Sequence, residues 1–180
     1  MVTININCWY KDNNNPIIDG NNELIFNFFM YFARFECCLK NKSEFLTKDN
    51  RDNAKPDWDK FGKQNKKIIN EIILSKEKKI SSAIEYLFDN PPKKQVVINQ
   101  FLDWKENNDL KVKNSKNLIL ILKTIRNNLF HWWKFNWNLW FWTENDKNLL
   151  KYWITIINEL VNIDNDIKMN YYEWLYFNKY

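Results

Sequence analysis

The chain has only two glycines among its 180 residues, Gly20 and Gly62. The loops that bind phosphate groups in P-loop and Rossmann proteins need several glycines close together, because their backbone must approach the phosphates closely. This chain has no such cluster, which excludes both classes of nucleotide-binding protein. It also contains no internal repeat, which excludes the repeat architectures.

Cysteines are few, and their spacing suits neither a zinc site nor a disulfide framework. The three are Cys8, Cys37 and Cys38, an odd number without the paired spacing that either kind of site needs. We therefore expect buried or free thiols, and we expect neither a metal ion nor another cofactor.

Long apolar runs are absent as well. No stretch reaches about 18 uninterrupted apolar residues, and the N-terminus has neither the basic nor the apolar region of a secretory leader. We expect a cytoplasmic protein that is not associated with a membrane. The net charge of +5 arises from 27 basic and 22 acidic residues, a balance that permits nucleic-acid binding without requiring it.

The chain does have a strong helical pattern of apolar residues, which predicts an all-α fold. The longest helix should cover residues 23–40, and another helix should begin near Leu110. Asp146 is expected to be the N-cap of a helix that continues through Leu160. Three further helices are expected at residues 64–74, 78–88 and 167–177. The helix that begins near Leu110 should turn an apolar stripe to the core, formed by Leu118, Leu122, Ile125 and Leu129.

Between these helices the pattern is less regular. Residues 42–55 are polar and are predicted to form a loop, and residues 56–62 a short turn. The pair Pro91-Pro92 ends the helix that precedes it, because proline lacks the N–H that a helix needs. Residues 95–105 predict a small β-hairpin or another extended excursion.

Glu36 is unusual within the long helix. With 3.6 residues per turn, Asn27, Tyr31 and Arg34 form one polar line, whereas Glu36 falls near the direction of Phe32. Glu36 therefore lies on a surface that is otherwise apolar.

One segment combines the residue types that cleave RNA. The single histidine, His131, follows one of the three arginines, Arg126, by five residues. The planar guanidinium of an arginine donates two parallel hydrogen bonds to a phosphate. A histidine suits proton transfer because its pKa, about 6.5, lies near neutral pH. Together they could hold a phosphodiester and deprotonate the adjacent ribose 2′-hydroxyl without a metal ion.

Helix geometry limits how the two residues cooperate. Five residues correspond to about 140° of rotation, so Arg126 and His131 do not share a face of a straight helix, whereas Asn127 and His131 do. We infer that His131 lies at or just past the helix end, where the chain can bend it towards Arg126. Asn127 would orient the imidazole or bind phosphate. Acid–base cleavage uses two proton-transferring groups, so one histidine per chain favours a site shared by two chains.

A structural interpretation of these residues is open too. His131 could cap the C-terminus of its helix, and Arg126 could form a structural ion pair. Glu36 could pair with Lys40, four residues later. From spacing alone, the structural interpretation is the favoured one.

A family resemblance reverses that preference. The string Lys123-Thr-Ile-Arg-Asn-Asn-Leu-Phe-His131 resembles the signature of HEPN-superfamily domains, in which Arg, a polar residue, three further positions and His close a core helix. Residues 32–40 resemble the aromatic, Glu-containing first core helix of bacterial members. The similarity covers most of residues 23–160.

The resemblance implies an HEPN-type helical bundle in a single domain of residues 1–180. Its core would cover about residues 23–163, with an N-terminal extension at 1–20 and a C-terminal helix at 165–180. Such domains commonly dimerise with their motifs facing each other, and many are metal-independent ribonucleases. Toxins, defence proteins and RNA-processing enzymes are among them. Other members bind RNA, nucleotides or proteins without cutting RNA.

The resemblance also assigns roles to residues. Arg126 and His131 match the functional pair, Asn127 matches the polar position, and Glu36 matches the acid that contacts the motif from the first helix. Further RNA contacts are expected at Lys123 and Lys134. The implied partners are RNA, a second copy of the chain and, for a toxin, an antitoxin of nucleotidyltransferase type.

The chain departs from the family directly after the histidine. Relatives usually have Gly-Gly-Lys there, whereas this chain has Trp132-Trp133-Lys134. Glycine suits such loops because it adopts positive φ and allows close backbone approach, and tryptophan supplies neither. Three explanations are open: UGA codons that mean glycine in the source organism, stacking of the rings on RNA bases, or packing against the last helices. The coding DNA tests the first explanation, since UGG codons would exclude it at Trp132, Trp133, Trp137, Trp140 and Trp142.

Overall fold

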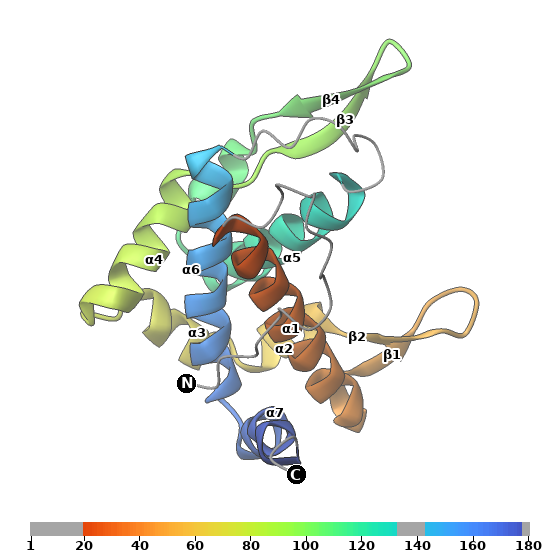
Figure 1. Cartoon of the computed structure of the whole chain (residues 1–180), viewed down its shortest axis with the longest axis vertical. Coiled ribbons are helices and arrows are strands. Elements are labelled where there is room, and N and C mark those ends of the chain that lie inside the picture. The colour runs from red at the N-terminus through yellow and green to blue at the C-terminus, as the bar shows by residue number, and fades with distance from the viewer. Residues whose placement is uncertain (1–19, 133–142, 178–180) are drawn as a thin grey trace, which may run out of the picture.

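The computed structural model describes residues 20–132 and 143–177 and shows a mostly helical chain with two small hairpins (Figure 1). The predicted all-α fold with a small hairpin is confirmed. The helices are α1 (Gly20–Asn41), α2 (Trp58–Gln64), α3 (Lys66–Ile73), α4 (Lys78–Asp89), α5 (Ser115–Trp132), α6 (Glu144–Val161) and α7 (Asn165–Phe177). The strands are β1 (Leu46–Lys48), β2 (Ala54–Pro56), β3 (Lys94–Ile98) and β4 (Phe101–Lys105).

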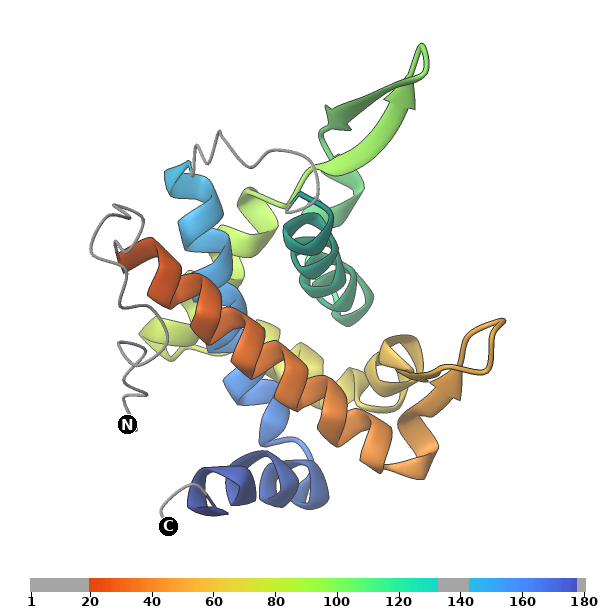
Figure 2. The ribbon, with the colours of Figure 1, turned by 45° about the vertical axis from the view of Figure 1, so that its right-hand side comes forward.

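Helix α6 lies at the centre of the bundle, where it contacts α1, α4, α5 and α7 (Figures 1 and 2). Trp153 of α6 is fully buried, and its ring centre lies 4.5 Å from that of Phe28 on α1. Its indole N–H donates a hydrogen bond of 3.0 Å to the carbonyl oxygen of Leu122 on α5. One side chain therefore joins three helices, and this fixes α5 against α1.

Helix α5 turns its predicted apolar stripe to the core. Leu118, Leu122, Ile125 and Leu129 are all buried, as the periodicity predicts. The helix begins at Ser115, later than predicted, because Leu110 belongs to a separate 3₁₀ turn (Asn108–Lys111). The side chain of Asn114 accepts a hydrogen bond from the Asn117 N–H, which caps the true start of the helix.

Gly62 allows α2 to pack closely on α5. A Cβ atom at this position would lie 2.9 Å from Cγ1 of Ile119, which is closer than two non-bonded carbon atoms approach each other. One of the two glycines in the chain thus allows two helices to pack closely, a role that a search for glycine-rich loops does not detect.

The prediction for residues 42–62 was wrong in two respects. Residues 42–55 form a 3₁₀ turn (Ser43–Phe45) and the antiparallel β1–β2 hairpin, not a plain loop. Phe45 explains the difference, because it is buried and its ring packs edge-on against Phe61 at 5.3 Å. Residues 56–62 contain most of α2, not a short turn, and Asp57 caps this helix by accepting a hydrogen bond from the Lys60 N–H.

The start of α6 also differs from its prediction. Thr143, not Asp146, is the N-cap, and the two residues form a capping box. The Thr143 hydroxyl accepts a hydrogen bond from the Asp146 N–H at 3.2 Å, and the Asp146 carboxylate accepts one from the Thr143 N–H at 3.1 Å. Asp146 therefore lies three residues into the element that it was expected to cap.

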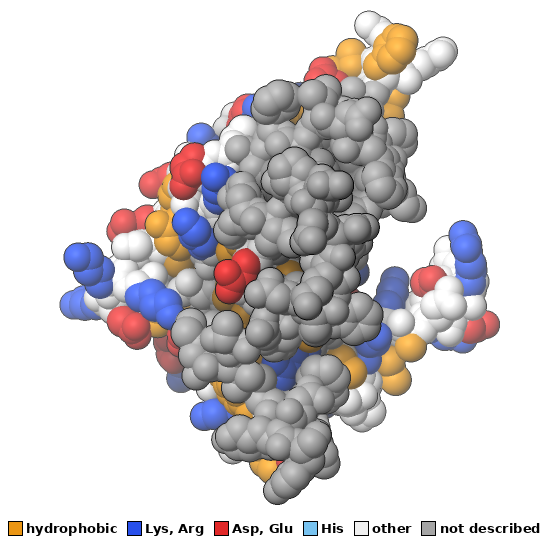
Figure 3. Space-filling view, in the orientation of Figure 1, with side chains coloured by type: hydrophobic (Ala, Val, Ile, Leu, Met, Phe, Trp, Pro, Cys, Tyr) orange, Lys and Arg blue, Asp and Glu red, His pale blue; other side chains and the backbone are white. Residues whose placement is uncertain are grey.

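The excursion at residues 95–105 is a β-hairpin, formed by β3 and β4 in antiparallel register. Its two-residue turn, Asn99-Gln100, has positive φ at both positions, 50° and 68°, as a type I′ turn requires. The hairpin projects from the helical body (Figure 2), and apolar side chains mark its tip in the space-filling view (Figure 3). Val97 and Phe101 are about three-quarters exposed, at 75% and 76%.

Helix α7 (Asn165–Phe177) packs against the polar line that the sequence placed on the first helix. The Arg34 guanidinium lies 5.0 Å from the centre of the Tyr171 ring and donates a hydrogen bond to the Tyr171 carbonyl oxygen. Tyr31 also stacks on Tyr171, at 6.4 Å between ring centres. Over residues 20–132 and 143–177, no helix is long and apolar enough to cross a membrane.

Candidate functional site

Arg126 lies on α5, two turns before the end of this helix, and is held against α1. Its Nη2 atom is 3.4 Å from both carboxylate oxygens of Glu36. Its guanidinium carbon lies 4.8 Å from the centre of the Phe32 ring, within the range of a cation–π contact. The side chain is 36% exposed, so Arg126 is anchored on α1 without being fully buried.

Glu36 has a second partner, which fixes its position. The indole N–H of Trp58 on α2 donates a hydrogen bond of 2.9 Å to Oε1 of Glu36. Trp58 itself is buried, and its ring packs on Phe35 of α1 at 5.2 Å. The Glu36 side chain is only 14% exposed, so its carboxylate is held between a buried donor and a cation.

Glu36, the acid that the family resemblance placed against the motif, forms an ion pair with Arg126. Glu36 lies on the Phe32 side of α1, away from the polar line of Arg34, as the helical period predicts. Its ion pair is with Arg126, and no ion pair with Lys40 is found among the described side chains. The pair joins residues 90 positions apart in the chain.

Trp58 and Phe32 are members of this cluster that the sequence reasoning missed. Phe32 lies one helical turn before Glu36, and this spacing on α1 was the available signal for its role. Trp58 had no comparable signal, because it reaches Glu36 only after the β1–β2 hairpin folds back and positions α2.

Asn127 is exposed and contacts its neighbour. Its side-chain oxygen accepts a hydrogen bond of 2.8 Å from Nη1 of Arg126. The amide of the next residue, Asn128, donates one of 2.7 Å to the carbonyl oxygen of Lys93 at the base of the β3–β4 hairpin. Asn127 therefore contacts the guanidinium of Arg126, one of the two residues that it was predicted to position.

The backbone of His131 lies in the last turn of α5, which ends at Trp132. It is thus at the helix end, as the geometry predicts, and one turn beyond Asn127. The orientation of its imidazole towards Arg126 remains a prediction. Lys134 and the tryptophans after position 132 up to Trp142 lie outside the described residues.

Lys123, the other expected RNA contact, lies one turn before Arg126 on the same helix. Its ammonium group is 2.9 Å from a carboxylate oxygen of Asp59 on α2. Both side chains are partly exposed, at 30% for Lys123 and 64% for Asp59, so this is a surface ion pair that contributes at most about 1 kcal/mol.

Within residues 20–132 and 143–177, no three side chains of His, Cys, Asp or Glu are grouped as a metal site would require. Comparisons of the chain with protein-family models, with curated proteins and with solved structures found no match. The functional assignment therefore depends on the residues of the cluster and on their chemistry.

Proposed function

We propose that the chain is a metal-independent endoribonuclease of HEPN type that acts as a homodimer. The observation that carries this proposal is the cluster around Arg126: its guanidinium is held by Glu36, Phe32 and Asn127, and its side chain remains partly exposed about two turns before the end of the motif helix. Groups held in place before the substrate binds stabilise the charge that develops in a transition state. Arg126 would bind the phosphate that is cleaved.

The chemistry follows from two proton transfers. The ribose 2′-oxygen attacks the phosphorus atom as one histidine takes the 2′-hydroxyl proton, and the bond to the 5′-oxygen breaks as that oxygen receives a proton. The products are a 2′,3′-cyclic phosphate and a 5′-hydroxyl. Because each chain has a single histidine, His131 of one copy would take the proton and that of the second copy would donate one.

The chain could instead be a non-catalytic HEPN module that binds RNA, a nucleotide or a protein partner. One observation favours this second candidate. The positive charge of Arg126 is already compensated by the carboxylate of Glu36, as it would be in a structural ion pair. The two candidates differ in whether RNA is cut.

Cleavage of mixed RNA in the presence of EDTA separates the two functions. We expect the chain to cut RNA, and we expect Arg126→Ala and His131→Ala to remove the activity. Arg51→Ala is the matched control, because Arg51 is exposed at the turn of the β1–β2 hairpin and outside the cluster. Activity that survives both site substitutions would refute the assigned site, and a chain that binds RNA without cutting it would support the second candidate.

The oligomeric state and the biological role have separate tests. Light scattering after gel filtration should give twice the mass of the chain, 22.2 kDa, if the active form is a dimer. For a toxin, we expect a neighbouring gene for an antitoxin of nucleotidyltransferase type. Defence and RNA processing are the roles expected without such a neighbour.

A further inference from the structure

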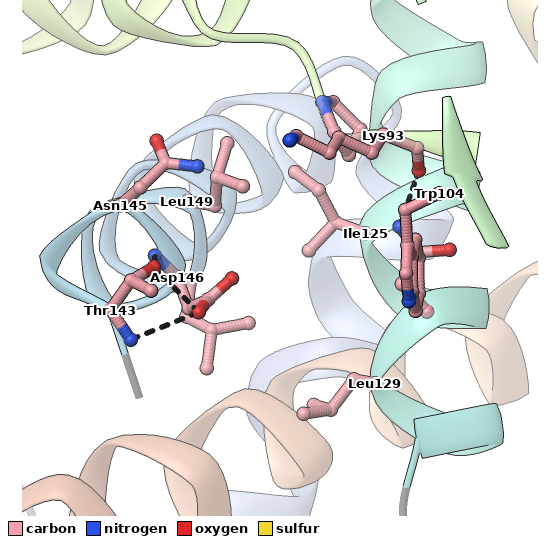
Figure 4. A pocket seen from close by; sticks show the side chains of 11 residues that line it. Lys93, Trp104, Ile125, Leu129, Thr143, Asn145, Asp146 and Leu149 are labelled. Atoms are coloured by element: carbon pink, nitrogen blue, oxygen red, sulfur yellow. Dashed lines mark hydrogen bonds between the residues drawn. The ribbon is translucent and has the colours of Figure 1, made fainter. Parts of the chain in front are cut away.

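A cavity of about 350 Å³ lies between α5, the first turns of α6 and the base of the β3–β4 hairpin (Figure 4). This volume is within the range of pockets that bind small molecules, about 300–1,000 Å³. We propose that the cavity binds a nucleobase of the RNA substrate, next to the bond that is cleaved. This inference rests on the proposed ribonuclease function for its place in the reaction.

The walls of the cavity suit a flat aromatic ring. Ile125 and Leu129 of α5 lie opposite Leu149 of α6, and Trp104 of β4 lies beside Ile125 (Figure 4). The Trp104 residue is 36% exposed, so its indole is accessible from solvent. Proteins that bind single-stranded RNA commonly stack unpaired bases on aromatic side chains of this kind.

Three polar side chains at the cavity each form a hydrogen bond within the protein through one polar atom, and among the described residues the other polar atom forms none. Asn145 accepts a hydrogen bond from the Tyr86 hydroxyl through its oxygen, at 2.8 Å. Oδ2 of Asp146 serves the capping box, and the amide nitrogen of Asn128 donates to Lys93. For the side chains that the structure describes, no hydrogen bond is found at the second polar atom of Asn145, Asp146 or Asn128.

The polar atoms without a hydrogen bond determine which nucleobase the cavity can recognise. Asn145 offers an N–H donor, whereas Asp146 and Asn128 offer an oxygen acceptor each. Figure 4 shows the carboxylate of Asp146 directed towards the space between α6 and α5. A carboxylate accepts hydrogen bonds from the exocyclic amino group of cytosine, and adenine and guanine carry such a group as well. Uracil has none, so it fits this set of acceptors least well.

The cavity adjoins the motif segment. Asn128 and Leu129, which line it, lie between Arg126 and His131 in the sequence of α5. The backbone of His131 is less than one helical turn from Asn128. A nucleotide whose base fills the cavity would therefore lie beside the last turn of α5, which carries the backbone of His131, whereas Arg126 is rotated about 200° from Asn128 and faces α1.

Nucleoside binding tests the pocket without involving the phosphate chemistry. Titration calorimetry of the full chain would use cytidine and uridine, which differ in their exocyclic amino and carbonyl groups, together with adenosine. We expect cytidine and adenosine to bind at least fivefold more tightly than uridine. Trp104→Ala should weaken cytidine binding by about 5- to 100-fold, and Trp104→Phe should retain most of it. Phe101→Ala is the matched control, because Phe101 is on the same strand, is exposed and does not line the cavity.

The outcomes separate this inference from the proposed function. Failure of all three nucleosides to bind at millimolar concentration would overturn the pocket, and so would binding that Trp104→Ala leaves unchanged or a preference for uridine. Because nucleosides carry no phosphate, these results do not depend on Arg126 or on cleavage. Nucleoside binding by a chain that cuts no RNA would refute only the ribonuclease, and cleavage without nucleoside binding would refute only the pocket.

Discussion

The hydrogen bond between Trp58 and Glu36 should stabilise the fold measurably, and a double-mutant cycle isolates its contribution. The substitutions are Glu36→Ala, which removes the acceptor, and Trp58→Phe, which removes the donor and keeps an aromatic ring against Phe35. Each also loses packing, and the cycle subtracts that loss because it occurs in the double variant too.

The magnitude follows from the environment of the bond. Its length is 2.9 Å, Trp58 is buried and the acceptor is a carboxylate oxygen, so a coupling energy of about 1.5–3 kcal/mol is expected. The ion pair of Glu36 with Arg126 adds little, about 0–1 kcal/mol, because Arg126 is 36% exposed and both N–O distances are 3.4 Å. Glu36→Gln retains an acceptor oxygen for Trp58 and should therefore cost less than Glu36→Ala.

Urea unfolding followed by circular dichroism gives the four free energies of the cycle. Glu85→Ala, on the exposed face of α4, is a control that should change stability by less than about 0.5 kcal/mol. A coupling energy below about 0.5 kcal/mol, or a Gln variant as unstable as the Ala variant, would show that the hydrogen bond does not hold Glu36.

Three further predictions concern stability and reactivity. Burial tends to raise the pKa of Asp164, but the hydrogen bond and charge of Lys42, together with the backbone N–H groups of Ile167 and Asp166, outweigh it and hold the pKa below its usual value. This stabilisation is present above about pH 4 and is lost as the pH falls through the lowered pKa, so wild type and Asp164→Asn should converge in urea stability in acid. Burial raises the pKa of Cys38 to about 11, so iodoacetamide at pH 8 should label exposed Cys37 and spare Cys38, as peptide mapping by mass spectrometry would show. Thr143→Ala should cost about 0.5–2 kcal/mol in urea unfolding by removing the N-cap of α6, and an unchanged midpoint would contradict the capping box.

Much of the fold was predictable because it depends on local periodicity. The stripe from Leu118 to Leu129 indicates a helix face whatever its partner is, and all of its four members are buried. The β3–β4 hairpin was predictable for a similar reason, since the β-formers on either side of Asn99-Gln100 are close enough in sequence to pair with each other across a two-residue turn. The cap of α6 was assigned wrongly because Thr143 and Asp146 both favour N-caps, and only their reciprocal hydrogen bonds decide between them.

The candidate site depended on contacts that local patterns do not contain. The period of α1 placed Glu36 on the apolar side of the helix, and the family resemblance supplied Arg126 as its partner. The contact of Trp58 with Glu36 requires the fold of the intervening hairpin, whose short polar strands resemble a loop in sequence. The contact between Trp58 and Glu36 is therefore a result of non-local packing, which local sequence patterns do not predict.

The ends of the RNA products test most directly whether Arg126 and His131 cut RNA by acid–base chemistry. We predict that wild-type chain in EDTA leaves 2′,3′-cyclic phosphate and 5′-hydroxyl ends, and that His131→Ala lowers the single-turnover rate by about 100-fold or more. RNA left intact by the wild type, or fragments with 5′-phosphate ends, would contradict this mechanism.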